Sequence, residues 1–126
     1  MCIRDRVTGF VDDGVQIIDI SDPTDIVAKD AQDDGDAGGF DELEGVREVK
    51  TFTVSGDTNT YAIAVSPTDD GVQILNITDP AAITATDAEA DGSNSFTELA
   101  GASGVDTFTI DGTLYAIVTG LSLIHI

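Results

Sequence analysis

"DDGVQIIDISDP" at Asp12–Pro23 returns almost unchanged as "DDGVQILNITDP" at Asp69–Pro80, 57 positions later. Each copy opens with Asp-Asp-Gly, continues in β-branched and other apolar residues, and ends in Asp-Pro. Proline cannot donate to a strand ladder and biases the residue before it away from helix, so each run is predicted to be a strand that ends in a turn. Val15 and Ile17 are expected to face one way and Ile18 and Ile20 the other. Such a strand needs cover on both faces, and stacked sheets provide it.

The repeat extends well beyond these twelve residues. Phe40–Leu43 matches Phe96–Leu99, with one residue inserted in the first copy, and Tyr61–Ile63 matches Tyr115–Ile117. Two periods of about 55 residues fill the stretch from 7 to 120, and a period of this length predicts one supersecondary unit per repeat.

The local pattern within each period is typical of β-structure. Gly56-Asp57 and Asp111-Gly112 supply the positive-φ residues of hairpin turns. "FDELEGVREV" at 40–49 is too short, and too interrupted by Gly45, for a helix, and we expect a structured loop. The predicted strands are "TFTV" and "TFTI" (51–54, 107–110), "TYAIAVS" and "LYAIVTG" (60–66, 114–120), "GVQIIDI" and "GVQILNI" (14–20, 71–77), and "IVAKDA" and "ITATDA" (26–31, 83–88).

Four strands per period, hairpin connections and burial on both faces together predict an all-β fold. We expect two four-stranded antiparallel blades of a β-propeller, forming part of a ring, with unit 1 at 7–63 and unit 2 at 64–120. The alternative is a β-sandwich in which the two repeats face each other as sheets.

The two ends are interpreted separately, because "MCIRDR" (1–6) and "LSLIHI" (121–126) can be encoded by one DNA element read in opposite directions. That element resembles the transposase end sequence used to prepare sequencing libraries. We therefore expect 1–6 and 121–126 to be translated adapter and the stretch between them to be an internal fragment of a longer protein.

Charge and composition exclude several kinds of chemistry. The chain has 5 basic and 24 acidic residues, a net charge of −19, and its only Cys and only His lie in the suspected adapter ends. No disulfide, zinc–histidine site or Ser-His-Asp triad can be assembled from the segment between them. The negative charge disfavours nucleic acid and anionic membrane surfaces and favours cations. No apolar run is long enough for a membrane span.

The segment resembles the LVIVD-type propeller repeats of secreted and surface-associated bacterial and archaeal proteins. The residues that carry the likeness are Tyr61–Val65 and Asp70–Pro80, with their partners Gly14–Pro23. The likeness covers nearly all of 7–120, although the acidic insert at Asp30–Gly38 is longer than that family leads us to expect. The resemblance implies a propeller fold and an extracellular or cell-surface location, and it implies no catalytic residues.

The acidic inserts are the candidate cation sites. Asp87, Glu89, Asp91 and Glu98, with Gly92 at the sharp turn, fit the ligand spacing of a calcium loop. The first copy offers Asp30, Asp34 and Asp36, with Glu42 displaced by the inserted residue. Hard carboxylate oxygens suit Ca²⁺. Because the flanking segments are strands and not helices, the alternative is a solvated acidic loop.

Smaller motifs are interpreted as turn chemistry. The aspartate pairs Asp12-Asp13 and Asp69-Asp70 precede a glycine, and turn roles are preferred over ligand roles. Asn76-Ile77-Thr78 has the form of a glycosylation sequon, but Asp19 stands at the same place in the first copy, which favours a turn.

Two functional hypotheses follow. The first is a non-enzymatic propeller segment of a larger secreted or cell-surface protein. It would bind a protein or carbohydrate ligand or act as a scaffold, would be stabilised by calcium, and would pack against further blades of the same chain. The second is a propeller enzyme, a metal-dependent hydrolase or lactonase, whose catalytic residues lie in other blades.

Overall fold

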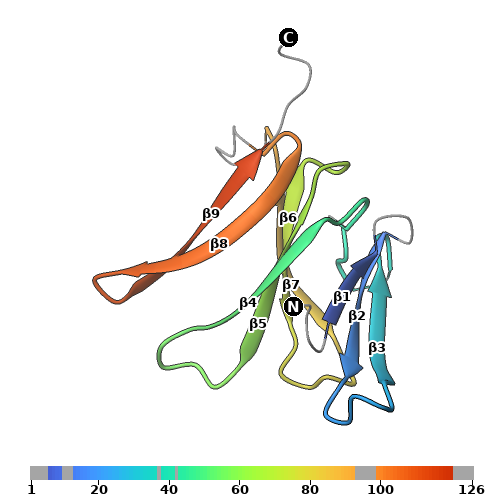
Figure 1. The fold of residues 1–126 in the computed structure, drawn as a ribbon. Helices are drawn as coiled ribbons and strands as arrows, with labels where there is room; N and C mark the ends of the chain where they lie inside the picture. Colours follow the sequence, from blue (N-terminus) through green and yellow to red (C-terminus); the bar gives the residue numbers. More distant parts are fainter. Residues whose placement is uncertain (1–5, 10–12, 37, 42, 93–98, 121–126) are drawn as a thin grey trace.

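The computed structural model describes residues 6–9, 13–36, 38–41, 43–92 and 99–120. Within these residues the chain forms strands, turns and loops and no helix, and every strand pair is antiparallel (Figure 1). The predicted all-β class is confirmed.

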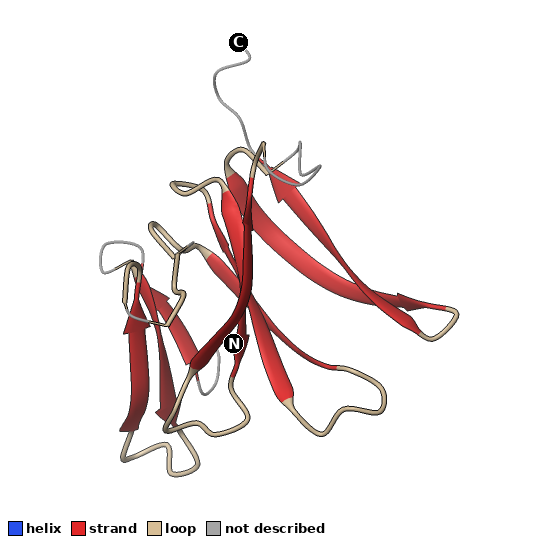
Figure 2. Cartoon of the chain, turned by 180° about the vertical axis from the view of Figure 1, so that it is seen from behind, coloured by secondary structure: helices blue, strands red, loops and turns tan. Residues whose placement is uncertain are grey.

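The strands form three sheets, each a meander in chain order. The first sheet contains β1 (Arg6–Gly9), β2 (Gly14–Asp19) and β3 (Val27–Asp33). The central sheet contains β4 (Glu48–Thr53), β5 (Thr60–Ser66), β6 (Gly71–Asn76) and β7 (Thr84–Ala90). The third sheet is the hairpin of β8 (Ala102–Ile110) and β9 (Thr113–Gly120). Figures 1 and 2, which view the chain from opposite sides, both place the central sheet between the other two.

The division into sheets differs from the expected pair of four-stranded blades. The described residues form one four-stranded sheet, flanked by a three-stranded and a two-stranded sheet. A repeat that is counted from residue 7 contributes its first three strands to one sheet and its fourth to the next. The cause is the loop at 40–47, which ends the first sheet's meander and carries the chain across to begin a new sheet at β4.

The central sheet is covered on both faces, as the apolar pattern predicts. On one face, Ala64 and Leu75 pack against Val15 and Ile17 of the first sheet, together with side chains from the loop. On the other face, Ile63 and Val65 pack against Ala102 and Val105 of the third sheet. Strand β5 is therefore buried from Ala62 to Ser66, and its odd and even positions belong to two different cores.

A β-bulge lies opposite the repeated strand in both sheets. The pairing of β2 with β3 shifts between Ile17 and Ile18, and the pairing of β6 with β7 shifts at the same place, between Ile74 and Leu75. The extra residue lies on the outer strand in both sheets, at Lys29 and Thr86. A bulge bends and twists the strand that carries it. The second face of β2 is less covered than expected, because Ile18 is only half-buried and Ile20 is exposed.

The predicted turn chemistry is present at several positions. Asp111 and Gly112 both have positive φ, as a two-residue hairpin of type I′ requires. Asp13 and Asp70, which precede the repeated glycines, are also left-handed, with φ of 59° and 57°. The side chain of Asn76 accepts a hydrogen bond from Thr78 N at 3.0 Å, and Asp19 accepts one from Ser21 N at 2.9 Å, so both copies close the strand with the same turn.

None of the described segments is a helix of the length and hydrophobicity that crossing a membrane would require.

Candidate metal centre

The loop that joins the first sheet to the central sheet is held by three aspartates. Three successive backbone amides donate to three different carboxylates: Leu43 N to Asp34 Oδ1 at 2.8 Å, Glu44 N to Asp69 Oδ2 at 2.9 Å, and Gly45 N to Asp13 Oδ1 at 2.8 Å. Charged acceptors form stronger hydrogen bonds than neutral ones. The backbone at residues 43–45 is therefore held in place, although these residues belong to no strand or helix.

The loop is also anchored from the apolar side. Phe40, Leu43 and Val46 are almost completely buried in the core between the first and central sheets. Gln73 of β6 is fully buried, and its amide oxygen accepts from Asp41 N at 3.0 Å while its amide nitrogen donates to Gly39 O at 3.2 Å. Backbone polar groups near the core are thereby satisfied.

The second repeat makes two of the same contacts. Asp91 Oδ1 accepts from Leu99 N at 2.9 Å, and Asp70 Oδ1 accepts from Gly101 N at 2.8 Å. These correspond to the contacts of Asp34 and Asp13 in the first repeat. The third contact, that of Asp69 with Glu44, joins one repeat to the turn before β6 of the next.

Three acidic side chains converge where the loop meets that turn. One carboxylate oxygen of each of Asp34, Glu44 and Asp69 lies within 4.8 Å of the others. Asp34 and Asp69 are half-buried, and Glu44 is exposed. Partial burial raises the pKa of Asp69 to about 6, and the negative charges of Asp34 and Glu44 add to that increase, whereas the hydrogen bond from Glu44 N opposes it.

The triad has the chemistry of a site for a hard cation. Carboxylate oxygens are the ligands that Ca²⁺ prefers, and Ca²⁺ takes six to eight oxygens in flexible geometry. Each carboxylate oxygen that accepts an amide hydrogen keeps a second lone pair, and the second oxygen of each group is a further ligand. Three carboxylates could therefore supply about half of a calcium shell or more, with water and backbone carbonyls as the remaining ligands. A cation would also offset the burial of the Asp69 carboxylate and its repulsion by Asp34 and Glu44, which raise the pKa of Asp69.

The sequence-predicted ligands of the first copy lie at different places. Asp30 is in β3, and its Oδ2 accepts from Ile83 N at 2.7 Å, which links the first sheet to the central sheet. Asp34 belongs to the triad. Asp36 Oδ2 accepts from Asp33 N at 2.8 Å within the turn after β3. Glu42 lies outside the described residues.

In the second copy, the strand continues into the predicted calcium loop. Asp87 and Glu89 are in β7, and Asp91 follows it in a turn; Glu98 lies outside the described residues. A strand rises about 3.3 Å per residue, so this backbone is more extended there than the start of a calcium-binding loop. The calcium loop of Asp87, Glu89, Asp91 and Glu98 stays a prediction.

Sequence reasoning did not group Glu44 and Asp69 with Asp34. A spacing pattern groups ligands within one short segment, whereas Asp69 comes from the turn of the next repeat. The doubled aspartates before each glycine were the available signal, because only one aspartate of each pair is needed for the left-handed turn position.

Comparison of the chain with protein-family models, with curated proteins and with solved structures finds no match. The repeat, the stacking of the sheets and the acidic contacts between them are therefore the features of this chain that bear on its function.

Proposed function

We propose that this chain is a non-enzymatic segment of a larger β-propeller protein outside the cell, where it serves in binding or scaffolding and is stabilised by calcium. The observation that carries the proposal is the equivalence of the two sheet interfaces. The first sheet packs on one face of the central sheet and the third sheet packs on the other. The same aspartate–amide hydrogen bond forms in the connecting segment of each repeat, from Leu43 N to Asp34 and from Leu99 N to Asp91. Repeat proteins gain stability when equivalent units stack, because each interface between neighbouring units buries its own apolar core.

The architectural part is tested by lengthening the chain. A tandem chain that carries one and then two additional copies of residues 64–120 is compared with the 126-residue chain by thermal and urea unfolding. A propeller-type stack predicts that the melting temperature rises with each added copy, because each copy covers an open face. A closed two-repeat sandwich predicts no gain, and that result would contradict the proposal.

The calcium part supports the same role, because the triad of Asp34, Glu44 and Asp69 joins the connecting loop to the next repeat. A cation held there would tie consecutive units together without any catalytic step. Free calcium at about a hundred times the dissociation constant would stabilise the fold by about 2.7 kcal/mol.

Calorimetry tests this binding with a matched pair of variants. Asp34→Asn with Asp69→Asn removes two charges from the triad while the amide oxygens can still accept from the loop backbone. Asp25→Asn with Asp111→Asn removes the same charge elsewhere. We expect calcium heat in the parent chain and in the control variant and none in the triad variant. Equal heats in both variants would refute binding at the triad.

A further inference from the structure

The third sheet exposes a strip of large apolar side chains on its outer face. Phe108 and Tyr115 are cross-strand partners with stacked rings 5.5 Å apart, and they are 41% and 46% exposed. Ile110 and Ile117, on the same face, are 55% and 57% exposed. We call these four residues the outer strip. Contiguous exposed apolar surface of this kind marks an interaction site.

The central sheet carries the same strip, and there it is partly covered, since Phe52 and Tyr61 are half-buried although Val54, the equivalent of Ile110, stays 39% exposed. Phe52 and Tyr61 form the equivalent stacked pair, with centroids 5.5 Å apart, and Ile63, the equivalent of Ile117, is only 4% exposed. Its cover is the third sheet, through Ala102 and Val105. The molecule therefore shows what kind of surface fits this strip, which is the opposite face of another sheet of the same repeat.

A groove between the first and central sheets could receive the outer strip. The groove has a volume of about 920 Å³, and Ile17, Ile18 and Ile20 of β2 and the segment following it face Val49 and Lys50 of β4 across it. The described part of the first sheet has no strand equivalent to β4 beside β1. At the other interface, β8, which is the β4 equivalent of the third sheet, contacts both β4 and β5. The corresponding strand of the first sheet would lie in this groove.

We propose that the β8–β9 hairpin of one copy of this chain inserts into this groove of a second copy. In the complex, β8 lies against the second copy's β4, and β9 pairs with its β2 in place of β1. The outer strip is then covered by the central sheet of the second copy, as its equivalent is partly covered within one copy. This self-association goes beyond the proposed function, since it requires neither calcium nor a longer protein.

The pairing is supported by the repeat itself. β9 and β1 are the same strand of the repeat and share the ending Val-Thr-Gly, at 118–120 and 7–9. Within the described residues, β1 pairs with β2 over four positions, and β5 pairs with β6 over six. In the register of β5 on β6, the segment Tyr115–Gly120 would pair with Gly14–Asp19 over the same six positions. A ladder of six positions would let β9 of a second copy compete with β1 for the edge of β2. Within the described residues, no strand pairs with the outer edge of β9, and open edges of this kind accept further strands.

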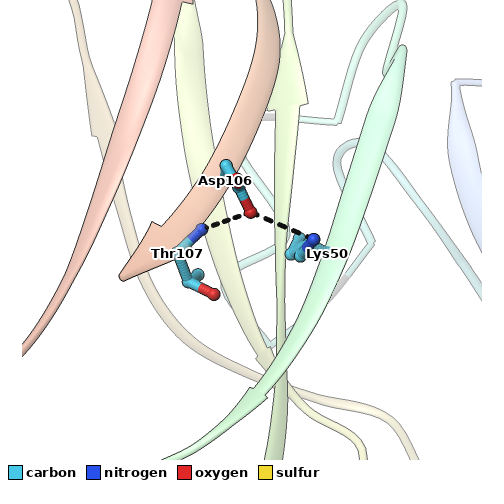
Figure 3. A network of polar contacts seen from close by, with 3 residues as sticks. All are labelled: Lys50, Asp106 and Thr107. Carbon is cyan, nitrogen blue, oxygen red and sulfur yellow. Dashed lines mark hydrogen bonds and ion pairs between the residues drawn. The ribbon is translucent and has the colours of Figure 1, made fainter. Parts of the chain in front are cut away.

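Charge favours the same partner. Lys50 of β4 and Asp106 of β8 form an ion pair at 3.0 Å between neighbouring sheets (Figure 3). The two residues occupy the same position of the repeat, and Lys50 also lines the groove. A hairpin that enters the groove would bring its own Asp106 toward Lys50 of the second copy. Because Lys50 already pairs with Asp106 of its own copy, the lysine would lie between two aspartates in the complex, and only this register provides that arrangement.

The contact is head-to-tail, because the hairpin and the groove are different surfaces of the chain. Heterologous contacts of this kind build rings where the rotation closes and open filaments where it does not. The expected product in solution is a series of oligomers whose size increases with concentration.

Light scattering coupled to size exclusion tests the association with the full 126-residue chain. We expect masses above the monomer's 13.1 kDa that increase with concentration. Ile117→Lys, in the outer strip, should return the chain to monomer, whereas Thr58→Lys, an exposed control with the same charge change, should leave the oligomers unchanged. A parent chain that is monomeric at all concentrations, or oligomers that persist in Ile117→Lys, would overturn the proposal.

A disulfide trap tests the geometry and does not depend on the folding of the lysine variant. In a Cys2→Ser background, Gln16→Cys and Val118→Cys are made in separate chains, which are then mixed and oxidised. The proposed register places these positions opposite each other, so a mixed disulfide dimer should dominate. Thr24→Cys mixed with Val118→Cys is the control and should give little. Equal yields from both mixtures would indicate nonspecific aggregation and would overturn the strand exchange.

Discussion

Three successive backbone amides, those of Leu43, Glu44 and Gly45, each donate to a different aspartate. From composition alone, these aspartates would be interpreted as cation ligands. In the structure, their carboxylates accept hydrogen bonds from the backbone of the connecting loop. Asp70 shows the second requirement at this scale, because it combines a left-handed backbone with the hydrogen bond from Gly101 N. Asparagine shares both properties, since it tolerates this conformation and its side chain also carries an acceptor oxygen.

Asp70 therefore separates the two roles of the repeated aspartate. Asp70→Ala removes the acceptor for Gly101 N and also the short polar side chain that lets aspartate tolerate a left-handed conformation better than alanine does, and we expect a loss of about 2 kcal/mol in the free energy of unfolding. Asp70→Asn keeps the acceptor and should lose well under half of that. Urea titration of both variants measures the difference, and equal losses would show that the hydrogen bond contributes nothing.

Asp69 predicts a pH dependence with a defined sign. Its pKa in the folded chain is raised to about 6 from the ordinary value of 3.8. The folded state therefore holds this proton more tightly than the unfolded state, and the resulting stabilisation is present below about pH 4 and is lost as pH rises through about 6. Because the group is partly solvated, we expect the change to be on the order of 1 kcal/mol.

The difference between the parent chain and Asp69→Asn isolates this residue from the other carboxylates. Several of those, among them Asp19 and Asp57, have pKa values lowered by hydrogen bonds and act in the opposite direction. We expect the parent to lose stability relative to Asp69→Asn between pH 4 and 7 in calcium-free buffer. A difference that does not change with pH would exclude the raised pKa. Calcium should bind more tightly above pH 6 than below it, because binding displaces this proton.

At the scale of the element, β5 shows how one strand serves two cores. Ile63 and Val65 face the third sheet, and Ala64 faces the first. Small side chains toward the first sheet allow the two sheets to approach closely, since protein interiors are packed at near-crystalline density. The equivalent strand β9 has the same alternation, but most of its side chains are exposed.

Ala62 and its repeat partner Ala116 make a matched test of this packing. Ala62 is 2% exposed and lines a cavity of about 20 Å³ between the sheets, too small for the three carbons that leucine would add. Ala62→Leu should therefore destabilise the chain by about 1–3 kcal/mol. Ala116→Leu makes the same change at an exposed position and should be nearly neutral. Chemical denaturation compares the two, and similar effects would mean that the interface between the sheets is not closely packed.

At the scale of the whole molecule, the net charge of −19 opposes compaction. Among the described residues, one ion pair, between Lys50 and Asp106, is seen, and both of its side chains are largely exposed. Apolar cover between sheets and aspartate–amide hydrogen bonds must therefore outweigh a general self-repulsion, which salt screens.

Salt should accordingly stabilise this chain. We expect the melting temperature to rise as sodium chloride is increased from about 10 mM to about 1 M, because the Debye length falls from about 30 Å to about 3 Å. Choline chloride, with a cation too large for the triad, should give a similar rise if general screening is the cause. A fall with both salts would mean that attractive ion pairs dominate the electrostatics of the fold.

Local features of the sequence were sufficient for most of the strands and for the turn at 111–112, but they missed β1 and the first five residues of β8, and Asp57 does not have the positive φ predicted for it. Alternating apolar residues, the Asp-Gly turn at 111–112 and the Asp-Pro strand ends act over a few residues, and each was predicted from those residues alone. The repeat likewise follows from direct comparison of one half of the chain with the other. Burial on both faces was predicted from apolar residues at adjacent positions of the repeated strand. It is confirmed for the central sheet, whereas Ile18 and Ile20 of the first repeat are half-buried and exposed.

Only the tertiary structure decided how the strands are divided among sheets and which carboxylates meet. The loop at 40–47 crosses from one sheet to the next, so a repeat unit and a sheet begin at different residues. Asp69 reaches Asp34 and Glu44 because two units stack, and spacing within a segment contains no information about that contact. The physical reason is the range of the interactions. Turns and strand patterns depend on neighbouring residues, whereas stacking and charge convergence depend on residues that become neighbours only after the chain has folded.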